Sequence, residues 1–363
     1  MSRRLAEEPL PACYAMVHPG LEDIAADEIT RDLGAEVKKT SRGIVAFRCS
    51  ELGPDVLKLR TVEDVFLLGW GTEDLTHRPS VDLEHICNWT RKAAWDQLLR
   101  IHHAIHTKPK GKPTYRLITQ MDGPHGYRRM DAGAAMAQGL EGVFPASWKS
   151  GNENAAVEVW LTIRGPQAVC GLRLSDRSMR HRGYKREHVP ASLRPSVAAA
   201  MVRLAGTGPG MKVLDPLCGA GTILAEQVEL ARQRGAGEIC IWGGDVEREA
   251  LRAAAANLRK FQPGLLQQWD ARQLPLADSC VDRIISNPPF GRQLGDPAEI
   301  AALYRKMIAE MDRVLKPDGR VVLVVEDARP LLDAVHYAGW QPQKQYRIRI
   351  LGLPAFISVW RKR

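Results

Sequence analysis

The chain has 363 residues, of which 45% are hydrophobic, 26% charged and 6% aromatic. This composition is close to that of folded globular proteins and excludes a wholly disordered, collagen-like or coiled-coil chain. Single hydrophobic cores stop growing near about 250–300 residues, so the length predicts more than one domain. The net charge of +9 favours a polyanionic partner, but only weakly, because it is spread over a long chain.

The sequence predicts a cytoplasmic protein without a membrane segment. No run approaches 18 consecutive apolar residues, and the first ten residues, MSRRLAEEPL, lack the unbroken apolar stretch of a signal peptide. The seven cysteines show no CxxC spacing. Scattered cysteines of this kind are typical of free thiols in a reducing compartment.

The first 175 residues combine short strand-like runs with helical patterns, as small α+β units do. Apolar side chains recur with helical spacing over residues 21–33, and residues 81–106 predict one long helix. The remaining elements predicted here are strands at 13–17, 43–47 and 114–120, a helix at 130–144, and paired strands at 155–163 and 167–174. We expect two units, residues 1–70 and residues 71–175.

A linker is predicted at residues 176–195. This stretch has no apolar periodicity and contains Gly183, Pro190 and Pro195, which interrupt regular structure. It lies at the end of a strongly basic segment, since residues 100–194 carry 16 basic and 7 acidic side chains.

From residue 196 onward, short β-branched runs alternate with helical stretches of ten or more residues. The strand-like runs are centred on KVLD, EICIWGGD, LLQQWD, VDRIIS and RVVLVVE. This alternation predicts βαβ units and a parallel sheet covered on both faces. The last two runs, QYRIRIL and AFISVW, are joined only by residues 352–354. A connection this short requires an antiparallel hairpin.

A glycine loop follows the first of these strands. Residues 215–222 read DPLCGAGT and lie between a strand and a helix. In such sheets ligands bind beyond the carboxyl ends of the strands, where Gly219 and Gly221 allow close approach of a ligand to the backbone. The third glycine of a dinucleotide fingerprint is absent, which argues against a dehydrogenase. The alternative is a tight turn that binds nothing.

Two aspartates end the next strands at the same edge of the sheet. Asp245 ends the second strand-like run and Asp270 the third. A carboxylate can accept hydrogen bonds from ribose hydroxyls or from an adenine amino group. The alternative role for each residue is a helix N-cap.

The tetrapeptide Asn287-Pro288-Pro289-Phe290 ends the fourth strand. An aromatic amine is a poor nucleophile because its lone pair is delocalised, and the Asn287 oxygen together with a backbone carbonyl can accept from the amine and localise that pair. Phe290 can stack on a base, and the two prolines stiffen the turn. The alternative is a strand-ending turn with a buried phenylalanine.

These segments resemble the class I, Rossmann-like S-adenosylmethionine-dependent methyltransferases that act on exocyclic amines. The order of parts resembles, more narrowly, the THUMP-containing RNA guanine-N2 methyltransferases. The resemblance implies a ferredoxin-like domain (1–70), a THUMP RNA-binding domain (71–175), a linker (176–195) and a Rossmann-like catalytic domain (196–363). That last domain would have a mostly parallel sheet with a C-terminal antiparallel hairpin.

The resemblance also implies which residues act. Cofactor binding would involve Asp215, Gly219, Gly221, Asp245, Asp270, Ala271 and Asn287. Asn287, Pro288 and Phe290 would position the target guanine. The basic residues expected to contact RNA are Lys108, Lys110, Lys112, Arg116, Arg128 and Arg129, with Arg182 and Lys185 in the linker.

The implied reaction is methylation of the N2 amine of a guanosine in tRNA by S-adenosylmethionine. Family members with the most similar architecture act at guanosine 6 of the acceptor stem. We expect a monomer, and a small activating subunit, which some relatives require, stays an open question. The alternatives are another amine (guanine in ribosomal RNA, adenine N6 or a protein glutamine) or a non-catalytic RNA-binding protein with this fold.

No metal site is predicted. His85, Cys87, His102, His103 and His106 lie near one another in sequence, but only His102 and His106 share a helical face, and no HExxH pattern exists. A solvated cationic surface is likewise an alternative to RNA binding for the basic residues of the middle segment.

Overall fold

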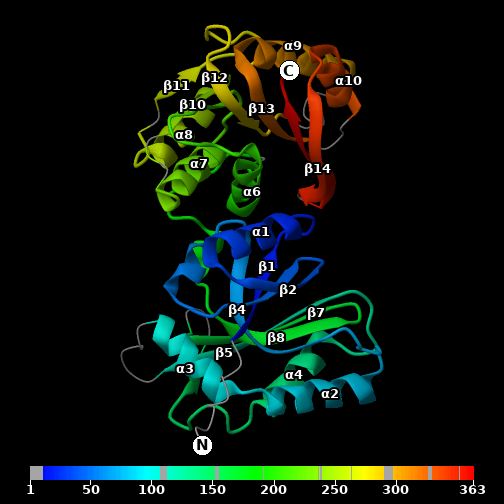
Figure 1. The fold of residues 1–363 in the computed structure, drawn as a ribbon. Helices are drawn as coiled ribbons and strands as arrows, with labels where there is room; N and C mark the ends of the chain where they lie inside the picture. Colours follow the sequence, from blue (N-terminus) through cyan, green and yellow to red (C-terminus); the bar gives the residue numbers. More distant parts are fainter. Residues whose placement is uncertain are drawn as a thin grey trace, which may run out of the picture.

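The computed structural model describes residues 11–106, 113–151, 155–190, 192–235, 237, 239–262, 264–289, 297–325, 329–350 and 352–363, with the side chains of residues 297 and 298 excepted. Two sheets organise this part of the chain, one in each half (Figure 1). Among the described residues, none of the helices has both the length and the apolar run that crossing a bilayer requires.

The first half forms an eight-stranded sheet in the order β2-β3-β1-β4-β8-β7-β5-β6. Its strands are β1 (Ala12–Val17), β2 (Glu36–Ser41), β3 (Ile44–Arg48), β4 (Val62–Thr72), β5 (Thr114–Asp122), β6 (Lys149–Ser150), β7 (Val157–Arg164) and β8 (Gln167–Arg173). Its helices are α1 (Glu22–Leu33), α2 (Pro79–Lys92), α3 (Trp95–Ile105) and α4 (Arg129–Gly139), with a 3-10 turn at Pro54–Lys58.

Strand β4 joins the two parts of this half into one sheet. It pairs antiparallel with β1 on one side and with β8 on the other. The predicted division between residues 70 and 71 therefore falls inside β4. The paired strands predicted at 155–163 and 167–174 are confirmed as β7 and β8, which pair antiparallel.

The single helix predicted over residues 81–106 is wrong, because two helices occupy this range. Ala93 has extended backbone angles, φ −69° and ψ 148°, so α2 ends there and α3 begins at Trp95. The Trp95 indole is buried and donates to the carbonyl oxygen of Thr90 at 2.7 Å. Burying this ring beside the end of α2 favours the break over a continued helix.

The second half forms a seven-stranded sheet in the order β11-β10-β9-β12-β13-β15-β14. Its strands are β9 (Lys212–Asp215), β10 (Cys240–Asp245), β11 (Leu265–Gln268), β12 (Val281–Ser286), β13 (Leu315–Val325), β14 (Gln341–Ile350) and β15 (Leu353–Arg361). The first five are parallel, and β15 runs antiparallel to both β13 and β14. The predicted α/β architecture with a terminal hairpin is confirmed.

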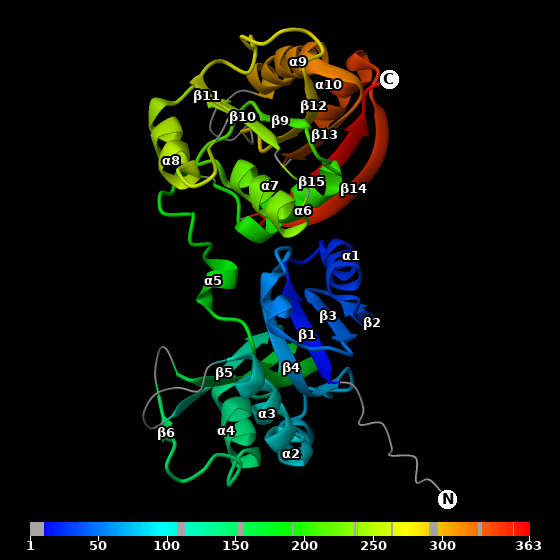
Figure 2. The same cartoon turned by 60° about the vertical axis from the view of Figure 1, so that its left-hand side comes forward.

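Helices cover both faces of the second sheet. Helices α9 (Pro297–Val314) and α10 (Arg329–Ala338) lie on one face, and α6 (Pro195–Ala205), α7 (Thr222–Gln233) and α8 (Arg248–Leu258) lie on the other (Figures 1 and 2). Strands buried on both faces explain the continuous apolar runs of β12 and β13, in which Ile284, Ile285 and residues 321–325 have essentially no exposed surface.

The two halves meet through α6 and α7. Ile24 and Ile29 of α1 belong to the same hydrophobic core as Val197 and Met201 of α6. Polar contacts reinforce this interface: both terminal guanidinium nitrogens of Arg203 donate to the Asp32 carboxylate at 2.9 Å. The predicted linker contains one short helix, α5 (Arg177–Arg180), whose N-cap Asp176 accepts from the Ser178 amide.

Candidate active site

A side-chain hydrogen bond connects the ends of β9 and β12, the two strands that lead into the predicted site residues. Asp215 ends β9, Ser286 ends β12, and Ser286 Oγ donates to Asp215 Oδ1 at 2.6 Å. The amide of Leu217 donates to the same oxygen at 3.2 Å. Asp215 is 1% exposed, and burial raises its pKa from 3.8 to about 7. The glycine loop and the segment before Asn287 are therefore held in one arrangement.

The backbone of the glycine loop requires its glycines. Gly219 and Gly221 have φ of +51° and +75°, a left-handed conformation that residues with a Cβ rarely adopt. A Cβ on Gly221 would lie 3.0 Å from Leu258 Cδ1, whereas a Cβ on Gly219 would meet only Val189 Cγ2, at 3.7 Å. Gly221 thus packs against α8, and Gly219 faces open space beside the loop that a ligand can enter.

Asp245 holds the loop and retains capacity for a ligand. Its Oδ2 accepts from the Gly219 amide at 2.9 Å, and its Oδ1 accepts from the Glu247 amide at 3.0 Å. Each carboxylate oxygen has a second lone pair, so both can also accept from the hydroxyls of a ribose. This acceptor set, beside a glycine loop open at Gly219, fits the nucleoside part of S-adenosylmethionine.

Asp270 lies in a different environment from Asp245. It is bound by its neighbour Arg272, whose Nη2 donates to Asp270 Oδ2 at 2.6 Å, and this contact lowers the pKa of the Asp270 carboxyl. The role predicted for Asp270 requires a ligand to share that carboxylate with Arg272. The Ala271 methyl is buried in the core, so this residue can offer a ligand hydrogen bonds only through its backbone.

Trp269 supports the loop, although the sequence did not indicate it. Its indole nitrogen donates to the Pro216 carbonyl at 3.0 Å, and a Cβ on Gly244 would lie only 2.1 Å from the ring atom Cε2. The second glycine of the Gly243-Gly244 pair is therefore required by a buried tryptophan. That pair in a strand was the available signal, because glycine inside a strand often marks a close approach.

The Asn287-Pro288-Pro289 turn is fixed from two sides. Asn287 directly follows Ser286, and its Oδ1 is shielded from solvent. Pro288 is buried, and the Pro289 carbonyl accepts from the Tyr304 hydroxyl of α9 at 3.1 Å. Tyr304, which the sequence did not reveal as a site residue, thus anchors the turn from the helix layer. Phe290 lies outside the described residues.

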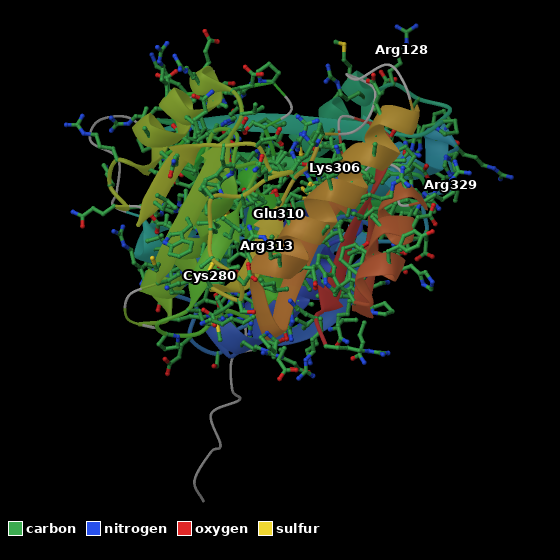
Figure 3. The ribbon with its side chains drawn as sticks, turned by 90° about the horizontal axis from the view of Figure 1, so that it is seen from above. Arg128, Cys280, Lys306, Glu310, Arg313 and Arg329 are labelled. Carbon is green, nitrogen blue, oxygen red and sulfur yellow. The ribbon has the colours of Figure 1, made fainter. Side chains whose placement is uncertain are left out.

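The basic residues predicted to contact RNA fall into different environments. Arg128 and Arg129 are exposed where α4 begins, and Arg128 extends from the periphery of the molecule (Figure 3). Arg116 is half-buried on β5. Lys108, Lys110 and Lys112 lie outside the described residues.

The linker residue Arg182 was predicted to contact RNA, and its burial contradicts this. It is 9% exposed, and its Nη2 donates to the Arg60 carbonyl at 3.0 Å. Its Nε lies 3.6 Å from Glu226 Oε1, which also accepts from the Tyr184 hydroxyl at 2.6 Å. Arg182 is buried because the fully buried carboxylate of Glu226 in α7 needs positively charged partners, and Arg182 and Arg60 both lie beside it.

Lys185 is similarly engaged, because its Nζ donates to the Leu193 carbonyl at 2.5 Å. The charged side chains of Arg182 and Lys185 therefore fix the path of the linker between the two halves. No cluster of three or more His, Cys, Asp or Glu side chains in the described part of the chain is arranged to hold a metal ion.

Asn257 of α8 connects the linker to the glycine loop. It is 2% exposed, and its Oδ1 accepts from the amides of Arg186 and Glu187 at 2.8 and 2.9 Å. Its Nδ2 donates to the carbonyls of Glu187 and Ala220, both at 2.9 Å. All four hydrogen-bonding positions available to the amide are thus occupied by two backbone segments that lie far apart in sequence.

Comparisons with known proteins agree with this geometry. Residues 182–354 match a family described as an RMKL-like methyltransferase domain. A tRNA (guanine(6)-N2)-methyltransferase of Thermus thermophilus is 28% identical over 334 residues, which cover 88% of this chain and 89% of that protein. A crystal structure of TrmN from Thermus thermophilus superposes with a TM-score of 0.76 at 25% identity, covering 97% of this chain and 99% of that one.

A similarity over a shorter part of the chain extends to mammals. The human tRNA (guanine(6)-N(2))-methyltransferase THUMP3 is 33% identical over 235 residues, which cover 58% of this chain and 44% of that protein. The match thus spans less than half of the human relative, whereas the Thermus relatives match along almost their whole length.

Proposed function

We propose that this protein methylates the N2 amine of a guanosine in tRNA, at guanosine 6, because residues 182–354 match the RMKL-like methyltransferase domain and the chain is similar to a tRNA (guanine(6)-N2)-methyltransferase over most of its length. The methyl donor is S-adenosylmethionine. The observation that carries the proposal is the bond between Ser286 and Asp215, since it joins the turn that would hold an amine to the loop that would hold the donor.

The residues of the site divide the work. S-adenosylmethionine supplies an electrophilic methyl group when bound. The Asn287 side-chain oxygen and a backbone carbonyl of the turn accept from the guanine amine, and Tyr304 fixes that turn through Pro289. Alignment of donor and acceptor can supply much of the acceleration of a displacement reaction. No general base is needed first, because the methylated amine can release its proton to solvent.

The target base must leave its stack to reach this turn. The N2 amine of a paired guanine lies in the shallow groove of the RNA helix, away from any enclosed pocket. We therefore include rotation of the base into the site in the proposal. Arg128 and Arg129, exposed on the first half, are the described residues proposed to hold the RNA there.

The proposal extends to the state of the enzyme in the cell. We propose a monomer working in the cytoplasm, which is consistent with free thiols at all seven cysteines.

A labelling experiment tests the reaction. The protein is incubated with labelled S-adenosylmethionine and an unmodified tRNA transcript that has guanosine at position 6, and the RNA is then digested to nucleosides. Label is expected in N2-methylguanosine, and it should disappear when position 6 is changed to adenosine. Label in N6-methyladenosine, or none in RNA, would overturn the proposal.

A variant then tests the site. Asn287→Ala should abolish turnover while S-adenosylhomocysteine still binds, because Asn287 is proposed to hold the amine. Retained turnover would remove the role given to Asn287.

A further inference from the structure

A cleft of about 580 Å³ separates the first half of the chain from the terminal hairpin. One wall comes from the β1–α1 loop and the β2–β3 turn, and includes Gly20 and Arg42. The other wall comes from β14 and includes Arg347 and Arg349. In Figure 1 the end of this hairpin lies directly above α1.

The three arginines of this cleft are exposed, and their side chains form no ion pair within the described part of the chain. Arg164 does not line the cleft, but it donates to the Arg42 carbonyl at 2.7 Å. Arg361, on the adjacent strand β15, is paired by contrast, because it donates to the Asp318 carboxylate at 2.8 Å. Positive charges gathered in a cleft without carboxylate partners favour a polyanionic ligand.

The acidic residues of the cleft only partly offset this charge. Glu22 also lines it, but its two oxygens accept from the amides of Gly20 and Gly43 at 2.9 and 2.6 Å. Asp23 is exposed at the rim. The three arginines that line the cleft therefore outnumber its two carboxylates, and the Glu22 carboxylate is already hydrogen-bonded to backbone amides.

Strand register places the hairpin arginines at the edge of the sheet where the site lies. Ser286 is level with Leu323 on β13, Leu323 with Ser358 on β15, and Ser358 with Gln345 on β14. Arg347 follows Gln345 by two residues, as Pro288 follows Ser286. Adjacent strands lie about 4.8 Å apart, so three spacings put this part of β14 about 14 Å from the Asn287 turn.

The cleft is a fixed feature because its walls touch at its base. His18 Nε2 forms a hydrogen bond of 2.6 Å with the Arg349 carbonyl. A Cβ on Gly20 would lie 2.1 Å from the Arg347 carbonyl oxygen, so the loop and the strand are in close backbone contact. Ile348 between the two arginines is 2% exposed and anchors β14 in the core.

We propose that Arg347 and Arg349, with Arg42 across the cleft, bind phosphodiesters of the substrate RNA close to the nucleotide being methylated. This rests on the proposed function, and it assigns the RNA contact near the site to the terminal hairpin instead of the linker. The negatively charged phosphates of the RNA can pair with these arginines, which have no carboxylate partner in the described part of the chain. Contacts to phosphates position an RNA without reading its sequence.

The test compares Arg347→Ala/Arg349→Ala with Arg361→Ala, a matched arginine on the same hairpin that is paired and lies at the opposite edge of the sheet. Dissociation constants for a fluorescent tRNA are measured by anisotropy over a range of salt concentrations, with S-adenosylhomocysteine present. Calorimetry measures the affinity for S-adenosylhomocysteine alone.

The double variant should bind tRNA about tenfold more weakly at low salt, and the slope of log affinity against log salt should fall by about two, because two phosphates are no longer neutralised. Affinity for S-adenosylhomocysteine should not change. Arg361→Ala should bind tRNA like the wild type. Equal tRNA affinity and salt slope in the double variant and the wild type would overturn the inference.

Binding is measured without turnover, so this outcome is separate from that of the labelling experiment. If the wild type binds tRNA through these arginines but transfers no methyl group, the cleft assignment holds and the proposed reaction fails. Arg42→Ala provides a second variant on the other wall, and its salt slope should be smaller than that of the wild type by about one.

Discussion

The hydroxyl of Ser286 donates to the carboxylate of Asp215 at 2.6 Å, and this bond joins β12 to β9 at the edge where the site lies. Both side chains are almost fully buried, so neither is shared with solvent. The two segments that must act together, the glycine loop and the Asn287 turn, are thereby held by a contact inside the sheet.

The first prediction concerns the pH dependence of stability. Burial raises the pKa of Asp215 to about 7 in the folded protein, above its ordinary 3.8, so the folded state holds this proton more tightly than the unfolded state. The resulting stabilisation is complete below about pH 4 and is lost as the pH rises through about 7. Asp215→Asn keeps the Oδ1 acceptor without the charge and should remove this dependence.

The measurement is the free energy of unfolding by urea for wild type and variant at pH 5 and pH 8. The wild type should lose a few kcal/mol relative to Asp215→Asn over this interval, at about 1.4 kcal/mol for each pKa unit. Parallel pH profiles for the two proteins would contradict the prediction.

Asn257→Ala should weaken cofactor binding. The substitution leaves the Ala220 carbonyl and the linker amides without the partner that holds them together. A buried hydrogen bond contributes about 1 kcal/mol, so affinity for S-adenosylhomocysteine should fall about five- to tenfold by calorimetry. Gln227→Ala is the control, since Gln227 is an equally buried amide of α7 that donates to Thr207 and not to the linker. A similar loss of affinity in both variants would indicate a general effect on the domain.

Glu226→Ala should destabilise the interface between the halves. Glu226 Oε2 accepts from Arg60 Nε at 2.6 Å, and its removal leaves buried Arg60 with only the longer ion pair to Glu229, at 3.6 Å. Such losses cost about 3–5 kcal/mol. Thermal and urea denaturation should show this loss, whereas Asp55→Ala, which breaks the exposed pair with Lys58, should change the free energy of unfolding by less than about 1 kcal/mol. A Glu226→Ala protein as stable as the Asp55→Ala protein would show that this network contributes little.

Tyr304→Phe should slow the reaction without weakening cofactor binding. The variant loses the hydroxyl that donates to the Pro289 carbonyl, so the Asn287 turn is less well positioned. A small displacement of a positioned group can cost as much as about 100-fold in rate, and we expect kcat to fall at least about tenfold. Single-turnover rates and the affinity for S-adenosylhomocysteine check this, with Tyr337→Phe, a change at an exposed tyrosine of α10, as control. Unchanged single-turnover rates would exclude a positioning role for Tyr304.

The catalytic half could be predicted well from its sequence because both faces of its sheet are buried. Continuous apolar runs that alternate with helices indicate parallel strands. The short connection at 352–354 requires an antiparallel hairpin. The polar ends of β9 and β12 were then expected at one edge, and the bond between Asp215 and Ser286 confirms that these ends meet.

Contacts between distant segments could not be predicted. The residues around Arg182 in the sequence do not indicate whether its side chain faces solvent or pairs with Glu226. Only the fold, which brings Glu226 close to it, determines this. The partners of Asn257 lie about 37 and 70 residues away along the chain. Strand β2 was missed because its EVKKTS sequence is polar and largely exposed at the edge of its sheet, so it has no apolar alternation to detect.

Strand β4 has a consequence for how this protein can be divided. It supplies hydrogen bonds to β1 and β8 at once, so cutting the chain near residue 70 would open the side of β8 that β4 covers and leave a new sheet edge ready to pair with other chains. A fragment meant to retain the first half should therefore begin before β1 and end after β8. The first 175 residues are best treated as one inseparable piece.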